Sequence, residues 1–373
     1  MIRFLCGETR AQLATLESES VQTVVTSPPY WGLRDYGLEP SIWDGNPECV
    51  HEWGEEKMSS QRLRNGAKGG LHEDRTTTKL LVNTTLPQGS LCRCGAWRGC
   101  LGLEPTPDAY VAHLVEVFHA VWRVLRKDGT LWLNLGDSYA GSRGLKPKDL
   151  VGIPWRVAFA LQAAGWTLRQ DIIWAKPNPM PESVTDRCTK AHEYVFLLTK
   201  GARYFFDAEA IKEPAVAGAA GSKFTAGKTA TAQPGHQAGA RVESDKRNKR
   251  DVWTVASQPY AEAHFATFPP KLVEPTIAAG SRAGDLVLDP FGGSGTTALV
   301  AKALGRDCAL IDQNAEYMRL ARKRCGEEER PLRRWALEKG LILPSGAESG
   351  AGEDSNPLPA KIPQIKMTLP LIP

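Results

Sequence analysis

The chain has 373 residues, 42% of them hydrophobic and 24% charged, and its formal net charge of +4 permits a nucleic-acid partner without demanding one. This length has room for one large α/β domain with additions, or for two domains. No apolar run approaches the roughly 20 residues that span a membrane, and the N-terminal segment lacks the apolar core of a signal peptide, so we expect a cytoplasmic protein with no membrane partner.

The first hundred or so residues predict two strands and an insertion. Short strands are expected at 2–6 and 21–26, with a helix over 9–17 between them. Residues 39–104 break this rhythm, because they are rich in Gly, polar and charged residues and contain four of the eight cysteines. We interpret this segment as an insertion into the domain.

A long amphipathic helix is expected over 105–129. Thr106 suits its N-cap, Pro107 its first turn and Gly129 its C-terminal stop. Apolar residues at helical spacing give this helix one buried face. The next expected elements are a strand at 130–136, a helix around 150–164, and strands at 168–176 and 194–200.

The second half of the chain begins with a change in composition. Residues 213–250 shift towards Ala, Gly, Lys, Arg and Thr without periodicity, which predicts a mobile basic segment. After it, a helix from Pro270, strands at 285–291 and 307–313, a loop and helix over 292–305 and a helix over 315–324 are expected, before a polar tail. Strands that alternate with helices predict an α/β fold with a doubly wound, mostly parallel sheet.

The strand over 21–26 is followed by Ser27-Pro28-Pro29-Tyr30. Prolines cannot donate to a sheet, so they end the strand, and Pro28 pushes Ser27 towards an extended conformation. Ser27 and Tyr30 are therefore expected on a stiff loop at the carboxyl end of a strand, where open α/β sheets bind their ligands. A surface proline turn without function is the alternative.

A glycine loop follows the strand over 285–291. Gly293, Gly295 and Ala298 fit the G-x-G-x-x-G/A pattern, in which glycines let the backbone approach a ligand at a helix N-terminus. Asp312, at the end of the next strand, is placed to hydrogen-bond a ribose hydroxyl. Alone, this pattern suggests NAD as readily as another adenosine-containing cofactor.

The two motifs together resemble those of S-adenosylmethionine-dependent DNA amino-methyltransferases, in the β arrangement of motifs. The resemblance is carried by Ser27–Tyr30 and by the run from Asp289 to Gly295, and it covers roughly 2–38 and 105–325. It implies the seven-stranded type of methyltransferase sheet, with double-stranded DNA as partner and S-adenosylmethionine as methyl donor. The acceptor is the exocyclic N4 of cytosine or N6 of adenine, reached by base flipping. Ser before the prolines favours cytosine N4.

The resemblance also implies a role for each matching position. Ser27, Pro28, Pro29 and Tyr30 form the catalytic loop, with the Ser27 hydroxyl and the Pro28 carbonyl on the amine and Tyr30 stacked on the base. The cofactor-binding positions are Glu8, Phe268, Asp289, Phe291, Gly292, Gly293, Gly295 and Asp312. A cognate restriction nuclease is a further partner that such an enzyme can have.

Five segments follow from this assignment. The catalytic half comprises 1–38 and 105–212, interrupted by the insertion at 39–104. Residues 213–250 are the basic segment, a candidate for target recognition, and Arg62, Arg64, Lys68 and Arg75 in the insertion are a second candidate. The cofactor-binding half is 251–330, and 331–373 is a C-terminal tail.

The cysteines of the insertion predict a metal site. Cys49 and His51 form one pair and Cys92 and Cys94 a second, and three thiols with one imidazole suit tetrahedral zinc. Because the insertion has too little hydrophobic content to fold alone, we expect a structural Zn²⁺ ion to stabilise its fold. Cys100 as a substitute ligand and four free thiols are the alternatives.

Two other classes of function remain open at this point. One is a catalytically silent, zinc-containing DNA-binding module, against which the intact Ser27–Tyr30 motif argues. The other is an NAD-dependent enzyme, which would leave that motif unexplained.

Overall fold

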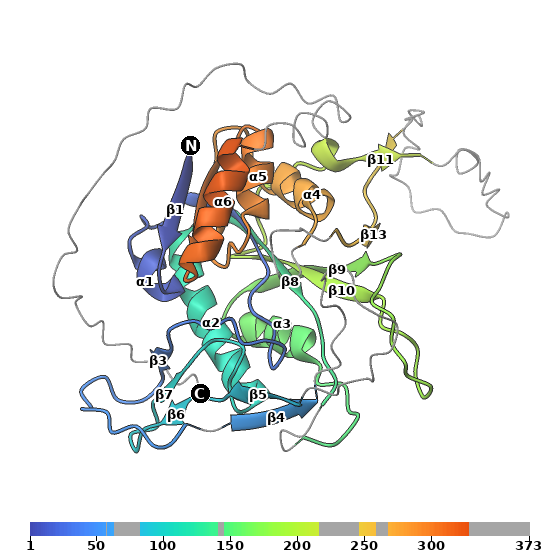
Figure 1. The fold of residues 1–373 in the computed structure, drawn as a ribbon. Helices are drawn as coiled ribbons and strands as arrows, with labels where there is room; N and C mark the ends of the chain where they lie inside the picture. The colour runs from blue at the N-terminus through green and yellow to red at the C-terminus, as the bar shows by residue number, and fades with distance from the viewer. Residues whose placement is uncertain (57, 63–82, 141–144, 216–245, 259–267, 328–373) are drawn as a thin grey trace, which may run out of the picture.

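The computed structural model describes residues 1–56, 58–62, 83–140, 145–215, 246–258 and 268–327. They form a three-layer α/β/α arrangement, with a central sheet between two groups of helices (Figure 1). Within these ranges, no helix has the length and apolar character needed to cross a membrane. The tail beyond residue 327 and most of the predicted basic segment, 216–245, lie outside the described residues.

The central sheet has eight strands in the order β1-β15-β14-β2-β8-β10-β9-β13. β10 is antiparallel to both of its neighbours, and the other neighbouring pairs are parallel. The mostly parallel sheet is thus confirmed. The strands are β1 Ile2–Cys6, β2 Val21–Thr26, β8 Leu125–Leu135, β9 Thr167–Ala175, β10 His192–Thr199, β13 Val252–Thr254, β14 Leu286–Asp289 and β15 Asp307–Asp312.

Each face of the sheet carries its own apolar core. In β8, Leu131 and Leu133 pack into one core while Trp132 packs into the other, because side chains alternate across a strand. The first core contains α1 Thr9–Ala14, α2 Pro107–Val124 and α3 Ile153–Ala163, and the second contains α4 Pro270–Gly280, α5 Thr296–Ala303 and α6 Ala315–Glu327. Helices on both faces make the sheet doubly wound, as predicted.

One strand was not predicted, and the predicted end of one helix is wrong. The sheet has an eighth strand, β13, which pairs in parallel with β9 and which the composition of its surroundings concealed. The long helix α2 ends at Val124, because Leu125 adopts an extended conformation (φ −71°, ψ 137°) and begins β8. Gly129 therefore lies inside a strand, where a Cβ would come within 2.6 Å of the Leu125 side chain.

The insertion contains short strands of its own. β3 Ser41–Trp43, β7 Trp97–Gly99 and β6 Ser90–Leu91 form an antiparallel sheet, and β4 Met58–Arg62 pairs with β5 Asn83–Pro87. Of its basic residues, Arg64, Lys68 and Arg75 lie outside the described residues. Beyond the insertion, a 3₁₀ turn at Glu209–Ile211 precedes β11 Glu213–Pro214, which pairs with β12 Lys246–Arg247.

Candidate active site

The two predicted motifs meet because their strands are neighbours in the sheet. β2 and β14 are parallel, with Val24 opposite Leu288, so the loops that follow them leave the sheet at the same edge. Between these loops lies a cavity of about 630 Å³, a size typical of small-molecule sites. The predicted residues that line it are Glu8, Ser27, Pro28, Pro29, Tyr30, Phe268, Phe291, Gly292, Gly293 and Asp312.

The glycine loop is shaped by close packing on one side and open space on the other. A Cβ at Gly292 would lie 2.3 Å from the Leu310 side chain, and one at Gly295 would lie 2.7 Å from the Ala321 Cβ. Gly293 has a φ of +50° and would meet nothing within 4 Å, so its α-carbon faces the open cavity. Only Gly can adopt the backbone conformation of this loop without strain and also pack this tightly without a steric clash.

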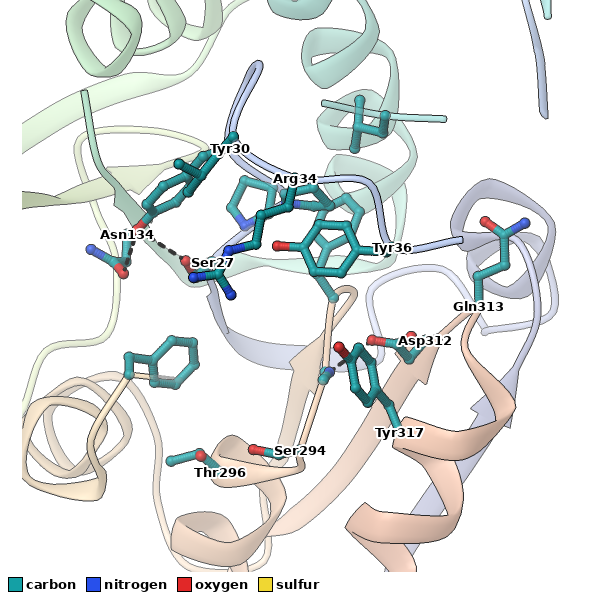
Figure 2. Close-up of a pocket in the computed structure, with 18 of the residues that line it drawn as sticks. Ser27, Tyr30, Arg34, Tyr36, Asn134, Ser294, Thr296, Asp312, Gln313 and Tyr317 are labelled. Carbon is teal, nitrogen blue, oxygen red and sulfur yellow. Dashed lines mark hydrogen bonds between the residues drawn. The ribbon is translucent and has the colours of Figure 1, made fainter. Parts of the chain in front are cut away.

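Asp312 fixes the loop from the end of β15. Its carboxylate accepts hydrogen bonds from the Gly293 N–H at 2.8 Å and from the Asn314 N–H at 2.8 Å. Burial raises the pKa of this carboxyl above its ordinary value. Figure 2 shows Asp312 beside Tyr317 and across the cavity from Ser27 and Tyr30, so the cavity has a glycine-loop side and a Tyr30 side.

Asp289 and Gly295 do not line the cavity, and their direct contact with a cofactor stays a prediction. The buried Asp289 carboxylate accepts hydrogen bonds from the hydroxyls of Thr26 at 2.7 Å and Thr297 at 2.6 Å, and from the Phe291 N–H. It therefore joins the end of β2 to the first turn of α5. Burial raises the pKa of Asp289 to about 6, against the opposing effect of these hydrogen bonds.

This raised pKa predicts how stability depends on pH. The carboxyl holds its proton more tightly in the folded protein than in the unfolded chain, so its stabilising contribution is complete below about pH 4 and is lost as pH rises through about 6. Asp289→Asn cannot ionise, so its stability relative to the wild type should increase by about 1.4 kcal/mol from pH 5 to pH 8. Urea unfolding of both proteins at the two pH values measures this, and parallel pH dependences would contradict it.

Hydrogen bonds to other parts of the chain fix the Ser27–Tyr30 loop. The Tyr110 hydroxyl donates to the Pro29 carbonyl at 2.8 Å, and the Trp31 indole donates to the Glu104 carbonyl at 3.0 Å. The Tyr30 ring also packs against Gly136, where a Cβ would come within 2.7 Å of the ring. The loop therefore has little freedom, as the prolines predicted.

Several polar residues of the cavity were missed by the sequence analysis. Glu193 in β10 accepts a hydrogen bond from the Tyr30 hydroxyl at 2.8 Å, and Asn134 Oδ1 in β8, at 3.1 Å, is the second acceptor within reach of the same proton. Lys176, which directly follows β9, pairs with Glu193. A polar residue inside an apolar strand was the available signal. Further lining residues of this kind are Arg34, Tyr36 and Tyr317 (Figure 2).

The four predicted metal ligands come together in the insertion. The ligand atoms of Cys49, His51, Cys92 and Cys94 all lie within 4.8 Å of one another. The sulfurs of Cys49 and Cys92 are 3.9 Å apart, and the Cys94 sulfur is 3.4 Å from His51 Nδ1. Cys100 is not in the cluster, since its thiol donates to the Leu38 carbonyl and it lines the cavity.

The part of the predicted basic segment that the structure describes is engaged internally. Arg247 and Arg250 both donate to the Glu213 carboxylate, at 2.9 and 2.7 Å. Phe268, a predicted cofactor-binding residue, is the first residue of a described range, because 259–267 lies outside the described residues.

Comparisons with known proteins agree with this architecture. Residues 21–323 match the N6/N4 methyltransferase family model, whose description is DNA methylase. Type II methyltransferase M.SmaI of Serratia marcescens is 39% identical over 345 residues, covering 86% of this chain and 90% of the relative. Type II methyltransferase M.XycI of Xanthomonas campestris pv. cyanopsidis is 39% identical over 341 residues, covering 85% of each.

Two solved structures share the fold. PvuII DNA methyltransferase (cytosine-N4-specific) superposes with a TM-score of 0.54 at 17% identity, over 92% of both chains. A DNA modification methylase candidate from Thermus thermophilus, complexed with S-adenosyl-L-methionine, gives a TM-score of 0.51 at 21% identity, over 88% of this chain and 95% of that one. Since the family match spans most of the chain and the relatives align over nearly their whole length, this chain belongs to the N6/N4 DNA methylases, the S-adenosylmethionine-dependent DNA amino-methyltransferases.

Proposed function

We propose that this protein transfers a methyl group from S-adenosylmethionine to the exocyclic N4 of a cytosine that has been flipped out of double-stranded DNA. The observation that carries the proposal is that the Ser27–Tyr30 loop and the Gly292–Gly293 loop line one cavity of about 630 Å³. A flipped base against the first loop and a cofactor against the second would then share one enclosed space.

The amine of cytosine is a poor nucleophile, because its lone pair is delocalised into the ring. We assign the Ser27 hydroxyl and the Pro28 carbonyl to accept its hydrogens, which localises the lone pair on nitrogen. We assign the Tyr30 ring, which packs against Gly136, to stack on the base. Pro29 keeps the loop rigid through its carbonyl, which accepts from Tyr110.

On the opposite side of the cavity, the residues fit an adenosine-containing cofactor. S-adenosylmethionine supplies the methyl group from its sulfonium when bound. We assign Gly292 and Gly293 to backbone approach, Asp312 to the ribose, and Glu8, Phe268 and Phe291 to the remaining cofactor surface. Asp289 and Gly295 act from behind the loop. The open space above Gly293 supports this assignment.

We also assign structural Zn²⁺ to the Cys49, His51, Cys92 and Cys94 cluster. A tetrahedral site with Zn–S bonds of about 2.3 Å and a Zn–N bond of about 2.0 Å has sulfur–sulfur edges of about 3.8 Å and sulfur–nitrogen edges of about 3.5 Å. The separations of 3.9 Å between the Cys49 and Cys92 sulfurs and 3.4 Å between the Cys94 sulfur and His51 Nδ1 are close to these edges. Four protein ligands complete the coordination, and none of them lines the cavity, so the ion would be structural. It would hold the insertion, whose Trp43 and Cys100 do line the cavity.

The relatives are Type II methyltransferases, and we propose the corresponding role for this chain. It would modify DNA at a specific sequence and so protect that DNA from a cognate restriction nuclease.

A single-turnover methylation assay tests the function. Wild-type protein should convert cytosine in plasmid DNA to N4-methylcytosine, identified in nucleoside digests by mass spectrometry. Ser27→Ala should slow the transfer about a hundredfold while changing DNA affinity little, because the lost interaction matters mainly in the transition state. N6-methyladenine as the sole product would support the second candidate, transfer to adenine. An unmethylated product with retained DNA binding would support a silent DNA-binding module.

A further inference from the structure

Transfer to an amine leaves a proton that the Ser27–Tyr30 loop cannot keep. When the new N–C bond forms, the nitrogen carries a positive charge until one of its N–H bonds breaks. The loop offers a serine, two prolines and a tyrosine, none of which is a base near neutral pH. The final acceptor of the proton must therefore lie outside the loop.

A chain of hydrogen bonds leads from Ser27 to a carboxylate. The Ser27 hydroxyl donates to the Tyr30 hydroxyl at 3.3 Å, and the Tyr30 hydroxyl donates to Glu193 Oε2 at 2.8 Å. Both bonds point the same way, towards Glu193. The first is long for an O–H···O bond, but such bonds commonly tighten when substrate is bound. Figure 2 shows the Ser27 and Tyr30 hydroxyls converging at this end of the cavity.

Tyr30 is suited to relay a proton while remaining protonated itself. Burial, together with the nearby Glu193 carboxylate, raises the pKa of the Tyr30 phenol well above its ordinary value. The phenol therefore stays protonated, and it can accept a proton from Ser27 only as it gives its own to Glu193.

The sheet explains why Glu193 lies there. β10 is antiparallel to β8, with Tyr194 opposite Leu135, which places Glu193 beside Gly136. The absence of a side chain at Gly136 lets the Tyr30 ring and the Glu193 carboxylate approach each other. Glu193 also accepts from the Asn134 amide at 3.2 Å and pairs with Lys176 beyond the end of β9.

From this geometry we infer that Glu193 is the final proton acceptor of the methyl transfer and acts through Tyr30 and Ser27. The inference rests on the proposed function. As the N–H bond of the methylated amine breaks, its proton passes to Ser27 Oγ, the Ser27 proton passes to the Tyr30 oxygen, and the Tyr30 proton passes to Glu193 Oε2. The products are a neutral methylamino group and a neutral Glu193 carboxyl, with both hydroxyls restored. Glu193 does not touch the base. It acts on the reaction only through Tyr30 and Ser27, and in this sense it is a positioning residue.

A double-mutant cycle tests this relay. Glu193→Gln keeps a hydrogen-bond acceptor for Tyr30 but cannot take up the proton, and Tyr30→Phe keeps the stacking ring but breaks the chain. Each should slow single-turnover transfer about a hundredfold, with the affinities for DNA and S-adenosylmethionine nearly unchanged. The double variant should be about as slow as either single one, because both changes interrupt one path. Wild-type rates in Glu193→Gln, or multiplying effects in the double variant, would overturn the inference.

Tyr194→Phe is the matched control. It removes a tyrosine hydroxyl from the residue next to Glu193 in β10, and Tyr194 is not among the residues that line the cavity. It should transfer methyl groups at the wild-type rate. In the free protein, the Glu193 carboxyl ¹³C signal, assigned by its loss in Glu193→Gln, should move in Tyr30→Phe and stay in place in Tyr194→Phe. An unmoved signal in Tyr30→Phe would overturn the contact itself, without reference to activity.

The same assay separates failure of the relay from failure of the proposed function. A wild-type protein that methylates neither cytosine nor adenine would contradict the function. A wild-type protein that methylates either base, with both variants equally active, would contradict the relay alone.

Discussion

Gly293→Val should abolish measurable binding of S-adenosylmethionine. Gly293 faces open space in the cavity and has a φ of +50°, so a branched side chain there would occupy the volume assigned to the cofactor. We expect the affinity measured by titration calorimetry to fall at least about a hundredfold, which corresponds to roughly 2.7 kcal/mol. Gly295→Val is less suitable, because its Cβ would collide with Ala321 and disturb the packing of α6.

Gly284→Val is the control for backbone strain. Gly284 also has a positive φ, +83°, also meets nothing within 4 Å, and does not line the cavity. Both variants should lose similar stability, roughly 1–2 kcal/mol, because a β-branched residue is strained in the left-handed region. Only Gly293→Val should lose the cofactor. Equal affinities in the two variants would move the cofactor away from this loop.

Cys94→Ser should remove the metal and destabilise the insertion. Protein purified without chelator should contain close to one zinc per chain by elemental analysis, and the variant should contain little. Because metal binding contributes directly to folding of such small segments, we expect a loss of about 3–5 kcal/mol and a fall in Tm of roughly 10 °C. The fluorescence of Trp43 and Trp97, which are buried in the insertion, should report its unfolding.

Cys100→Ser distinguishes the cluster from an ordinary thiol. Cys100 lies in the same insertion but outside the cluster, and serine can still donate to the Leu38 carbonyl. This variant should keep its zinc and its Tm. The metal site would be refuted by wild-type protein without zinc together with an unchanged Tm in Cys94→Ser.

Local sequence patterns predicted most of the elements around the site. The prolines after β2 and the glycines after β14 each mark a strand end, and both loops line the cavity. The N-terminal cap of α2 was also predictable, since the Thr106 side chain accepts from the Ala109 N–H and Pro107 occupies the first turn. Such signals are local, because a cap or a turn is satisfied by residues a few positions away.

The remaining residues depend on contacts that a local pattern does not contain. Glu193, Asn134 and Lys176 come from three different strands or their ends, and only the strand order of the sheet brings them to Tyr30. The end of α2 was mispredicted for a related reason. Gly129 has the appearance of a helix stop, but pairing of β8 with β2 draws the chain into a strand four residues earlier, at Leu125. Tertiary pairing thus overrides a local preference.

The carboxylate of Asp289 connects the two sides of the cavity, since it binds Thr26, the residue before Ser27, and Thr297 in the first turn of α5. Neither threonine lines the cavity, so this connection between the two loops runs outside it. In the proposed reaction, a ligand on one side that shifted this carboxylate would change the affinity on the other side, and such linkage is reciprocal. The factor by which a bound methyl donor favoured binding of the target base would then equal the factor by which the bound base favoured retention of the donor.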